Sequence, residues 1–503
     1  MPRTSGEVGG GIRVNHRPHV VIIMADQLRE DVLSPEITPH ISRLFSESFR
    51  FRRAYCASPL CVPARGSFFT GRYPNETGCV INPWTLAEKG HGLVASGIPN
   101  LYQHLEENWD SRHVGKQHFL TVDAIDRLAN SPTKWRNSEE EYGPFLREHG
   151  RRAPGGERFR GIVPEMAFGT TTRLKKYSIP ATGCYEEGID YFFDGYILNT
   201  AVEAIRDRDR SRPLLLNAMF LAPHPPLDIP EPWYSKFRRK EIVLPENVGR
   251  WSAKQSPLQL YNLTGAIGSR YTREDWGEIW KTYLGLVSLL DDCVGRLVEE
   301  LKRQAMYDDT LIVFTSDHGE MLGSHGLWQK MCMYEEATRV PLGIKFPRED
   351  RSRYGDRGSD EPVSAIDVFP TLCDYLGAPI PEGVSGKSLM PVVNGSSRSE
   401  PRNVYIQFDG NGARGNFQRC LVQGCDKLIV DWFKDEIFLE LYDLSNDPME
   451  QENLIFEVGR RELAARLLVD LTAHMERTGD LLRLPTNLYD SFINQYGPFY
   501  SNK

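Results

Sequence analysis

Long hydrophobic runs are missing from this sequence. Its 503 residues contain no stretch of about 18 consecutive apolar residues, so no membrane-spanning helix is expected. The first 18 residues, MPRTSGEVGGGIRVNHRP, also lack the continuous apolar core of a secretory signal. These two absences predict a cytoplasmic protein without a membrane partner.

An excess of positive charge is missing as well. Lysine and arginine together number 60, aspartate and glutamate number 68, and the net charge is −8. Proteins that bind nucleic acid are usually basic, because lysines and arginines neutralise phosphates. The composition therefore argues against a nucleic-acid partner. Contents of 40% hydrophobic and 25% charged residues are ordinary for a globular protein.

The cysteines do not form the pattern of a disulfide framework. The chain has nine of them, an odd number, at irregular spacing. Cys420 and Cys425 are close enough in sequence to pair or to bind a metal, but no second pair follows them. Reduced thiols are therefore expected. Internal repeats and low-complexity tracts do not occur either.

What the sequence does contain is an alternation of strand-like and helix-like segments. Apolar runs typical of strands buried on both faces occupy residues 19–25, 214–221, 311–316 and 340–346. Helical spacing of apolar residues occurs over 36–50, 101–107, 196–206, 283–302 and 366–376. This alternation predicts an α/β protein with a large, mostly parallel sheet flanked by helices.

The pattern changes near residue 395. Four segments beyond it are typical of antiparallel strands and a fifth of a closing helix: 403–408, 419–422, 427–432, 440–444 and 460–476. We therefore expect a catalytic domain over residues 1–395 and a smaller α+β subdomain over 396–503. The polar segment 121–190 is interpreted as loops and insertions around a site. The aromatic tail, residues 484–503, is expected to be non-helical and to pack along the body or against a second copy in a homo-oligomer.

Polar side chains follow several of the predicted strands. Asp26 and Gln27 come directly after the first strand, and Asp317 and His318 come after the strand at 311–316. Ligands of open α/β sheets gather beyond the carboxyl ends of the strands. Two carboxylates, an amide oxygen and an imidazole suit a divalent cation, most simply Ca²⁺, with Mg²⁺ or Mn²⁺ as alternatives. Taken singly, either aspartate is better explained as a loop cap.

Cys61 opens the pentapeptide Cys-Val-Pro-Ala-Arg. Pro63 suits the first turn of a helix that Gly71 ends, so Cys61 would lie at a helix N-terminus, where negative charge is favoured. Arg65 adds a fixed positive charge one turn later. A lone cysteine is usually a small buried hydrophobe, and a thiolate is a poor ligand for a hard cation. This mismatch suggests that the side chain becomes an oxygen species.

Further groups that can carry charge or protons are Lys116, His118, His224 and Lys330. His224 follows the strand at 214–221, and Lys330 follows a glycine-bearing loop after Asp317. Each alone has an ordinary explanation as a surface lysine or a packed histidine. We expect one crevice to bring all of them together.

Taken in chain order, these motifs resemble the type I sulfatases of the alkaline-phosphatase superfamily. The segment from Cys61 to Arg65, followed by Thr70-Gly71-Arg72, is similar to the family signature. The other matching positions are Asp26-Gln27, Gly115-Lys116-Gln117-His118, Pro223-His224, Asp317-His318-Gly319-Glu320 and Lys330. Gln27 departs from the usual acidic residue. In this family a maturation enzyme oxidises the cysteine to formylglycine (3-oxoalanine), which hydrates to a gem-diol.

The resemblance implies a sulfuric ester hydrolase that acts on a small sulfated sugar or another small sulfate ester. It implies catalytic roles for Cys61, Arg65, Lys116, His118, His224 and Lys330. It implies metal ligation by Asp26, Gln27, Cys61, Asp317 and His318, and substrate binding by Lys116, His224, Lys330 and His325. In the implied mechanism Arg65, Lys116 and Lys330 stabilise the sulfuryl oxygens. His224, with Lys330, protonates the leaving alcohol, and His118 accepts a proton from the diol.

Two other hypotheses stay open. A phosphonate monoester or phosphodiester hydrolase of the same superfamily uses the same formylglycine and similar metal ligands, although the Lys116-x-His118 motif favours sulfate. A catalytically inactive binding protein would keep the scaffold with an unmodified Cys61. Specificity is expected from residues 75–190 and from the tail. Candidate pocket residues are Trp84, His91, Tyr185 and His325, each of which has packing as an alternative.

Overall fold

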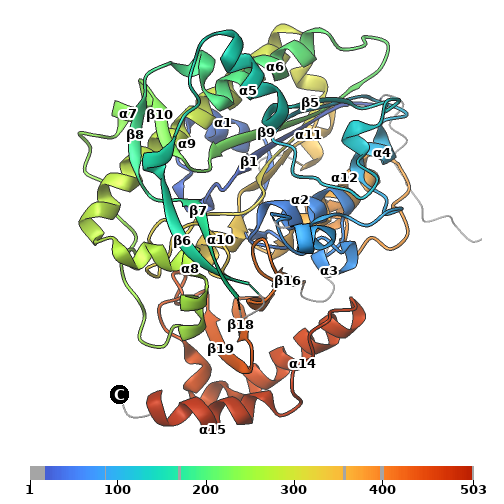
Figure 1. The fold of residues 1–503 in the computed structure, drawn as a ribbon. Coiled ribbons are helices and arrows are strands. Elements are labelled where there is room, and N and C mark those ends of the chain that lie inside the picture. Colours follow the sequence, from blue (N-terminus) through green and yellow to red (C-terminus); the bar gives the residue numbers. More distant parts are fainter. Residues whose placement is uncertain (1–16, 85, 168–170, 355–357, 397–401, 501–503) are drawn as a thin grey trace, which may run out of the picture.

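A computed structural model describes residues 17–84, 86–167, 171–354, 358–396 and 402–500. Its centre is an eight-stranded sheet (Figure 1). In spatial order the strands are β14 (Gly358–Ser359), β2 (Phe49–Phe51), β13 (Leu342–Lys345), β11 (Thr310–Ser316), β1 (His19–Asp26), β9 (Leu214–Pro223), β4 (Asp110–Gly115) and β5 (Lys134–Asn137). The five strands from β11 to β5 are parallel, whereas β13 runs antiparallel to both β11 and β2. The prediction of a mostly parallel sheet is confirmed.

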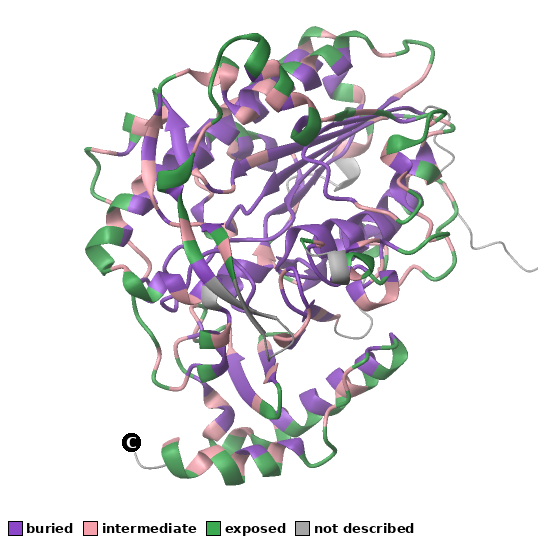
Figure 2. Cartoon of the chain, viewed as in Figure 1, coloured by how far each residue is buried: buried purple, intermediate pink, exposed green. Residues whose placement is uncertain are grey.

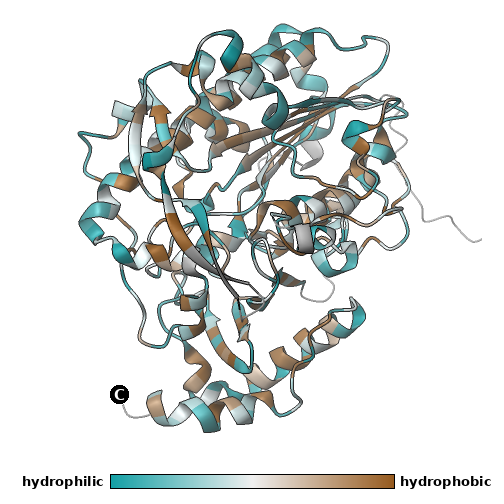
Figure 3. Ribbon diagram, in the orientation of Figure 1, coloured by the Kyte–Doolittle hydropathy of each residue, from teal (hydrophilic) through white to brown (hydrophobic). Residues whose placement is uncertain are grey.

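Both faces of this sheet are covered by helices. Alternate residues of β1 point to opposite sides: Val21 and Ile23 pack with α1 (Pro39–Ser46), α6 (Phe193–Arg206) and α9 (Arg273–Arg303). Val20 and Ile22 pack with the other layer, which contains α2 (Cys61–Thr70), α4 (Leu101–Leu105) and α12 (Val368–Leu376). The central strands are accordingly buried in Figure 2 and hydrophobic in Figure 3. This burial explains their uninterrupted apolar sequences.

Shorter elements surround these layers. The small strands are β3 (Ala54–Tyr55), β12 (Arg339–Val340), β15 (Val363–Ser364), β8 (Thr182–Tyr185) and β10 (Leu227–Pro230). The small helices are α3 (Pro74–Thr77), α7 (Trp233–Lys236), α8 (Leu263–Ala266), α10 (Glu335–Thr338), α11 (Arg348–Tyr354) and α13 (Met390–Val393). No helix in the described ranges is both long enough and apolar enough to cross a bilayer.

The segment 121–190 is more regular than predicted. It contains α5 (Ser138–Glu148) and a hairpin of β6 (Arg160–Ala167) and β7 (Thr171–Ser178), so the interpretation as loops was wrong in part. The hairpin lacks a clean alternation of apolar and polar residues. Val163 and Tyr177 pack on Ile267, but Ile162 and Leu174 are exposed. A two-stranded ribbon with apolar residues on both faces gives no period-2 signal.

The C-terminal region is a separate antiparallel sheet with helices against it. Its strands are β16 (Asn403–Phe408), β17 (Phe417–Gln423), β18 (Asp426–Phe433) and β19 (Glu436–Asp443), and its long helix is α14 (Arg461–Arg477). The predicted strands and closing helix are present. The division of the chain at residue 395 remains a prediction.

Two predictions about secondary structure were wrong, one on the conformation of the tail and one on the end of the first helix. The tail is helical: α15 (Leu488–Tyr500) lies along the C-terminal sheet with Leu488 and Phe492 buried. Their i, i+4 spacing is a helical signal, which Gly497 and Pro498 near the helix end had concealed. The helix predicted for 36–50 ends at Ser46, and the chain continues into β2.

Candidate active site

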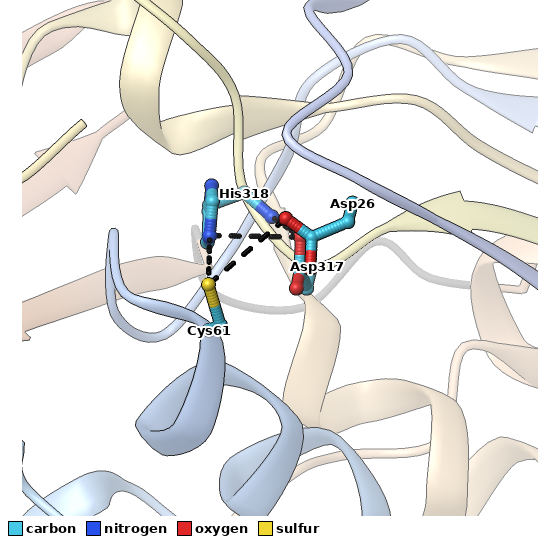
Figure 4. Close-up of side chains that lie close together, drawn as sticks. All are labelled: Asp26, Cys61, Asp317 and His318. Carbon is cyan, nitrogen blue, oxygen red and sulfur yellow. Dashed lines mark hydrogen bonds and ion pairs between the residues drawn. The ribbon is translucent and has the colours of Figure 1, made fainter. Parts of the chain in front are cut away.

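Cys61 lies at the N-terminus of α2, as the sequence predicts. Leu60 is the extended residue before the helix, and Gly71 ends it in the left-handed conformation, with φ 66°. The Cys61 thiol is buried, with its Sγ 3.1 Å from His318 Nε2 and 4.0 Å from Asp26 Oδ1 (Figure 4). The helix N-terminus supplies a positive dipole end, which favours an anion at this position. The Val62 N–H in its first turn is already bonded to Asn82 Oδ1 at 3.1 Å.

Four buried side chains converge here from three elements. Potential ligand atoms of Asp26, Cys61, Asp317 and His318 all lie within 4.8 Å of one another (Figure 4). The cause is the sheet register: β1 and β11 are adjacent and parallel, and Ala25 pairs with Ser316. Both strands therefore end at the same edge, and Asp26 and Asp317 directly follow the two paired residues.

Two cations compensate the aspartates. Arg65 donates from Nε to Asp317 Oδ2 at 2.9 Å and from a terminal nitrogen to Asp26 Oδ2 at 3.1 Å. Lys116 Nζ lies 2.6 Å from Asp26 Oδ2. Burial alone would raise the pKa of Asp26, but the positive charges of Lys116 and Arg65 outweigh it and hold that pKa well below its usual value. Both carboxylates are thus held in place by fixed positive charge.

Arg65 lies behind the carboxylates and does not reach the pocket. Its third contact is a hydrogen bond to the Lys116 carbonyl at 3.1 Å, and its side chain is almost fully buried. The guanidinium orients Asp26 and Asp317. That it also stabilises charge on the sulfuryl oxygens, which needs no direct contact, remains a prediction.

The side chain of Gln27 is held in place by Glu320, the last residue of the Asp317-His318-Gly319-Glu320 motif. The sequence had predicted no role for Glu320. The backbone of Gln27 has φ 69°, and its N–H donates to Asp317 Oδ1 at 3.1 Å. Its side-chain amide nitrogen donates to Glu320, so the amide oxygen faces Lys330, whose Nζ lies 2.5 Å away. Glu320 is itself held by the backbone N–H groups of Leu322 and Gln329. The amide oxygen of Gln27 is thereby presented to the site.

His118 has a carboxylate partner that sequence reasoning missed. Its Nε2 lies 3.0 Å from Glu139 Oε1, on the first turn of α5. Burial would lower the pKa of His118, but Glu139 raises it above its usual value. Burial would raise the pKa of Glu139, but His118 brings it down to about 2. Three consecutive glutamates begin α5, and only the fold shows which one faces His118.

His224 follows β9 and lines the pocket. Its Nδ1 lies 2.6 Å from the Pro225 carbonyl oxygen, so this nitrogen carries the proton and Nε2 is left as an acceptor. Burial, with Lys330 and Lys116 nearby, lowers the pKa of His224 to about 3. In this state the ring does not donate a proton from Nε2.

A pocket of about 740 Å³ opens above Cys61. Of the predicted residues it is lined by Cys61, Lys116, His118, His224, Lys330 and Trp84. His325 does not reach it, because a turn with φ 56° at this residue directs the ring onto Tyr334, with ring centroids 3.9 Å apart and no exposure. Tyr185 is likewise packed, and His91 lies outside the lining. Substrate binding by His325 is therefore not supported.

The donor set fits a divalent cation. The carboxylates of Asp26 and Asp317 and the His318 imidazole offer mostly hard ligands within 4.8 Å of one another. The Gln27 amide oxygen, held against Lys330, is a further oxygen donor beside them. The Cys61 thiol is the exception among them. A cation site beside a potential nucleophile is the chemistry that attack on a tetrahedral oxyanion ester requires.

Comparisons with known proteins agree with this class. The family model described as "Sulfatase" matches residues 18–378, and that described as "N-sulphoglucosamine sulphohydrolase, C-terminal" matches residues 323–477. A choline-sulfatase of Rhizobium meliloti is 30% identical, covering 87% of this chain and 82% of its own. An arylsulfatase of Clostridium perfringens is 25% identical, with 87% and 90% covered. The crystal structure of a phosphonate monoester hydrolase of Agrobacterium radiobacter shares the fold, with TM-score 0.73, 23% identity and coverage of 92% and 96%.

The chain therefore belongs to the type I sulfatase family of the alkaline-phosphatase superfamily, and it is a sulfatase. The resemblance noted from the motifs is confirmed.

Proposed function

We propose that this sulfatase hydrolyses sulfate monoesters of small sulfated sugars through Cys61, after conversion of its thiol to formylglycine. The observation that carries this proposal is the convergence of Asp26, Asp317 and His318 on Cys61 at the floor of the pocket. A maturation enzyme would carry out the oxidation. A hydrated aldehyde supplies an oxygen nucleophile and a second hydroxyl group, whose deprotonation lets the C–O bond break and the aldehyde re-form.

The divalent cation would be held by Asp26, Gln27, Asp317 and His318. When bound, it supplies Lewis-acid stabilisation of negative charge at the nucleophile and at the ester. Ca²⁺ suits the predominance of oxygen donors. The chain's own contribution is rigidity: Arg65 orients both aspartates, and Glu320 orients the Gln27 amide.

Lys116 and Lys330 bind the sulfuryl oxygens. Both line the pocket, both are 4% exposed, and both sit beside the proposed cation ligands. Ammonium groups in a partly desolvated site stabilise the charge that develops on the ester oxygens during transfer. Because both lysines are already held in position, no side chain has to move to stabilise this charge during the reaction.

Proton transfer is divided between two sides of the pocket. His118, oriented by Glu139, accepts the proton of the diol. On the leaving-group side Lys330, which lines the pocket, is the donor to the departing alcohol. His224, whose Nε2 is an acceptor, positions the substrate by accepting a hydrogen bond from a hydroxyl group of the sugar.

Cys61→Ala tests the proposal. We expect hydrolysis of 4-nitrophenyl sulfate to fall by at least about a thousandfold in kcat, as is usual when a covalent nucleophile is removed. Cys79→Ala is the matched control, since Cys79 is also buried against α2 but lies outside the pocket. If Cys61→Ala were as active as both Cys79→Ala and the wild type, Cys61 would have no covalent role.

A second candidate is hydrolysis of phosphonate monoesters or phosphodiesters. The ligand pattern of Asp26-Gln27 with Asp317-His318 accepts either kind of tetrahedral ester. Lys116 and His118 on the pocket wall favour the sulfate ester. Values of kcat/KM for 4-nitrophenyl sulfate and for a 4-nitrophenyl phosphonate on the same matured enzyme decide between them.

A further inference from the structure

The pocket is far more cationic than the rest of the protein. Among its lining residues in the described part of the chain, five are cationic and one, Glu139, is a carboxylate. The chain as a whole carries a net charge of −8. The cationic lining residues are Lys116, Lys330, Arg160, Lys175 and Lys176. Such a local excess of positive charge in an acidic protein concentrates anionic ligands.

These cations form two groups. Lys116 and Lys330 are buried beside Asp26 and Gln27, where the sulfate ester that reacts would bind. Arg160, Lys175 and Lys176 belong to the hairpin of β6 and β7. A single sulfate ester needs only the inner group. A pocket of about 740 Å³ is also much larger than one sulfate and has room for one or two sugar rings.

One of the hairpin cations, Lys175, lies beside an aromatic surface. Lys175 Nζ lies 5.5 Å from the ring centre of Trp84 and 5.2 Å from that of Tyr177. Trp84 is 44% exposed, and its ring lies 5.9 Å from that of His118. An exposed ring next to the reacting group, flanked by a lysine, suits a sugar ring with an acidic substituent.

Lys176 is available to exchange partners. It pairs with Glu157 at 2.5 Å, but both side chains are at least half exposed. Surface ion pairs of this kind contribute little stability, so an incoming sulfate or carboxylate can replace Glu157 at small cost. The strand register places Arg160 opposite Ser178, two residues along from Lys176, on the same face of the hairpin.

We infer that the hairpin of β6 and β7 binds a second anionic group of the substrate, a carboxylate or a further sulfate on the same or the adjoining sugar. This inference rests on the proposed function of the pocket. It also disfavours a quaternary ammonium alcohol as the leaving group, because the hairpin charges would repel it. Arg160, Lys175 and Lys176 are thus specificity-determining residues.

Calorimetric binding to the full chain carrying Cys61→Ala tests the inference without turnover. The probes are N-acetylglucosamine 6-sulfate with one anionic group, glucosamine 2-N,6-O-disulfate with two, and choline sulfate with one anionic and one cationic group. We expect the disulfated sugar to bind about tenfold more tightly than the monosulfated one, and choline sulfate to bind most weakly. Raising the salt from about 20 to about 200 mM should reduce the preference.

The hairpin is then neutralised by Arg160→Gln, Lys175→Met and Lys176→Gln together. The preference for the disulfated sugar should disappear, while affinity for the monosulfated sugar changes by less than about threefold. Lys240→Gln is the matched control, since Lys240 forms a similar surface pair with Glu36 at 2.7 Å.

Two outcomes would overturn the inference. One is equal affinity for the disulfated and monosulfated sugars in the protein with its hairpin charges intact, and the other is a preference for the disulfated sugar that survives neutralisation. If matured wild-type enzyme cleaves no sulfate ester, the proposed function is wrong. The binding measurements use a variant that cannot turn over, so they test the role of the hairpin independently of that outcome.

Discussion

Arg65→Met removes the cation that bridges the two buried aspartates. The guanidinium makes contacts of 2.9 Å with Asp317 and 3.1 Å with Asp26, and neither carboxylate is exposed to water that could replace them. Removing one partner of a buried ion pair costs about 3–5 kcal/mol, because the remaining charge stays buried. We expect a loss of folding stability of this size in the presence of a chelator.

Excess calcium should return part of this stability. A bound divalent cation would compensate the same two carboxylates, and a ligand that binds only the folded state stabilises it. The assay is guanidinium unfolding of wild type and Arg65→Met, each with EDTA and with calcium. The control is Arg52→Met, which loses a surface pair with Asp360 at 3.3 Å and should change stability by no more than about 1 kcal/mol.

Two results would refute this reasoning. If Arg65→Met is as stable in EDTA as wild type, the aspartates are not charged partners of Arg65. If calcium stabilises neither protein, the carboxylates do not form a cation site. Arg65→Lys separates charge from shape, since a single ammonium group cannot make both contacts and should recover only part of the loss.

Three further predictions concern other parts of the chain. Glu139→Gln removes the charge that raises the pKa of His118, so the acidic limb of the kcat–pH profile should move to lower pH; an unchanged limb would contradict this role of Glu139. Asp194→Ala leaves the Leu221 and Ala222 amides unpaired and should lower kcat about tenfold through His224, whereas Asp194→Asn, which keeps an acceptor oxygen, should not. Phe492→Ala should destabilise the C-terminal sheet by about 3 kcal/mol in urea unfolding; no change would contradict the packing of α15.

Much of the fold could be read from the sequence because the central strands are buried on both faces. Continuous apolar runs identified β1, β9 and β11, and the sheet register then brought Asp26 and Asp317 together. The position of a residue that follows a buried strand is set by the place of that strand in the sheet. The proximity of Asp26 and Asp317 was therefore predictable from the sequence.

The pocket walls were not predictable in the same way. Glu139 is one of three adjacent glutamates, and His325 looks like a site residue because it sits in a glycine-bearing loop after Asp317. Only the left-handed backbone at His325 shows that its ring turns toward Tyr334. The direction of a side chain in a loop depends on the backbone dihedral angles of that loop. The spacing of hydrophobic residues, which predicts helices and strands, does not predict these angles.

The role of Arg65 shows the same limit. Its place one turn after Cys61 predicted a fixed positive charge near the nucleophile, but not that the guanidinium would bridge the two aspartates. A buried arginine between buried carboxylates is better explained as a positioning group. Its distance from the pocket follows from packing that the sequence alone does not specify.

The most direct test of the account is peptide mass spectrometry of position 61, compared with activity across preparations that differ in maturation. We expect 4-nitrophenyl sulfate hydrolysis to rise in proportion to the fraction of Cys61 converted to the aldehyde, and we expect protein whose Cys61 is entirely thiol to be inactive. Full activity in protein whose Cys61 is an intact thiol would contradict it.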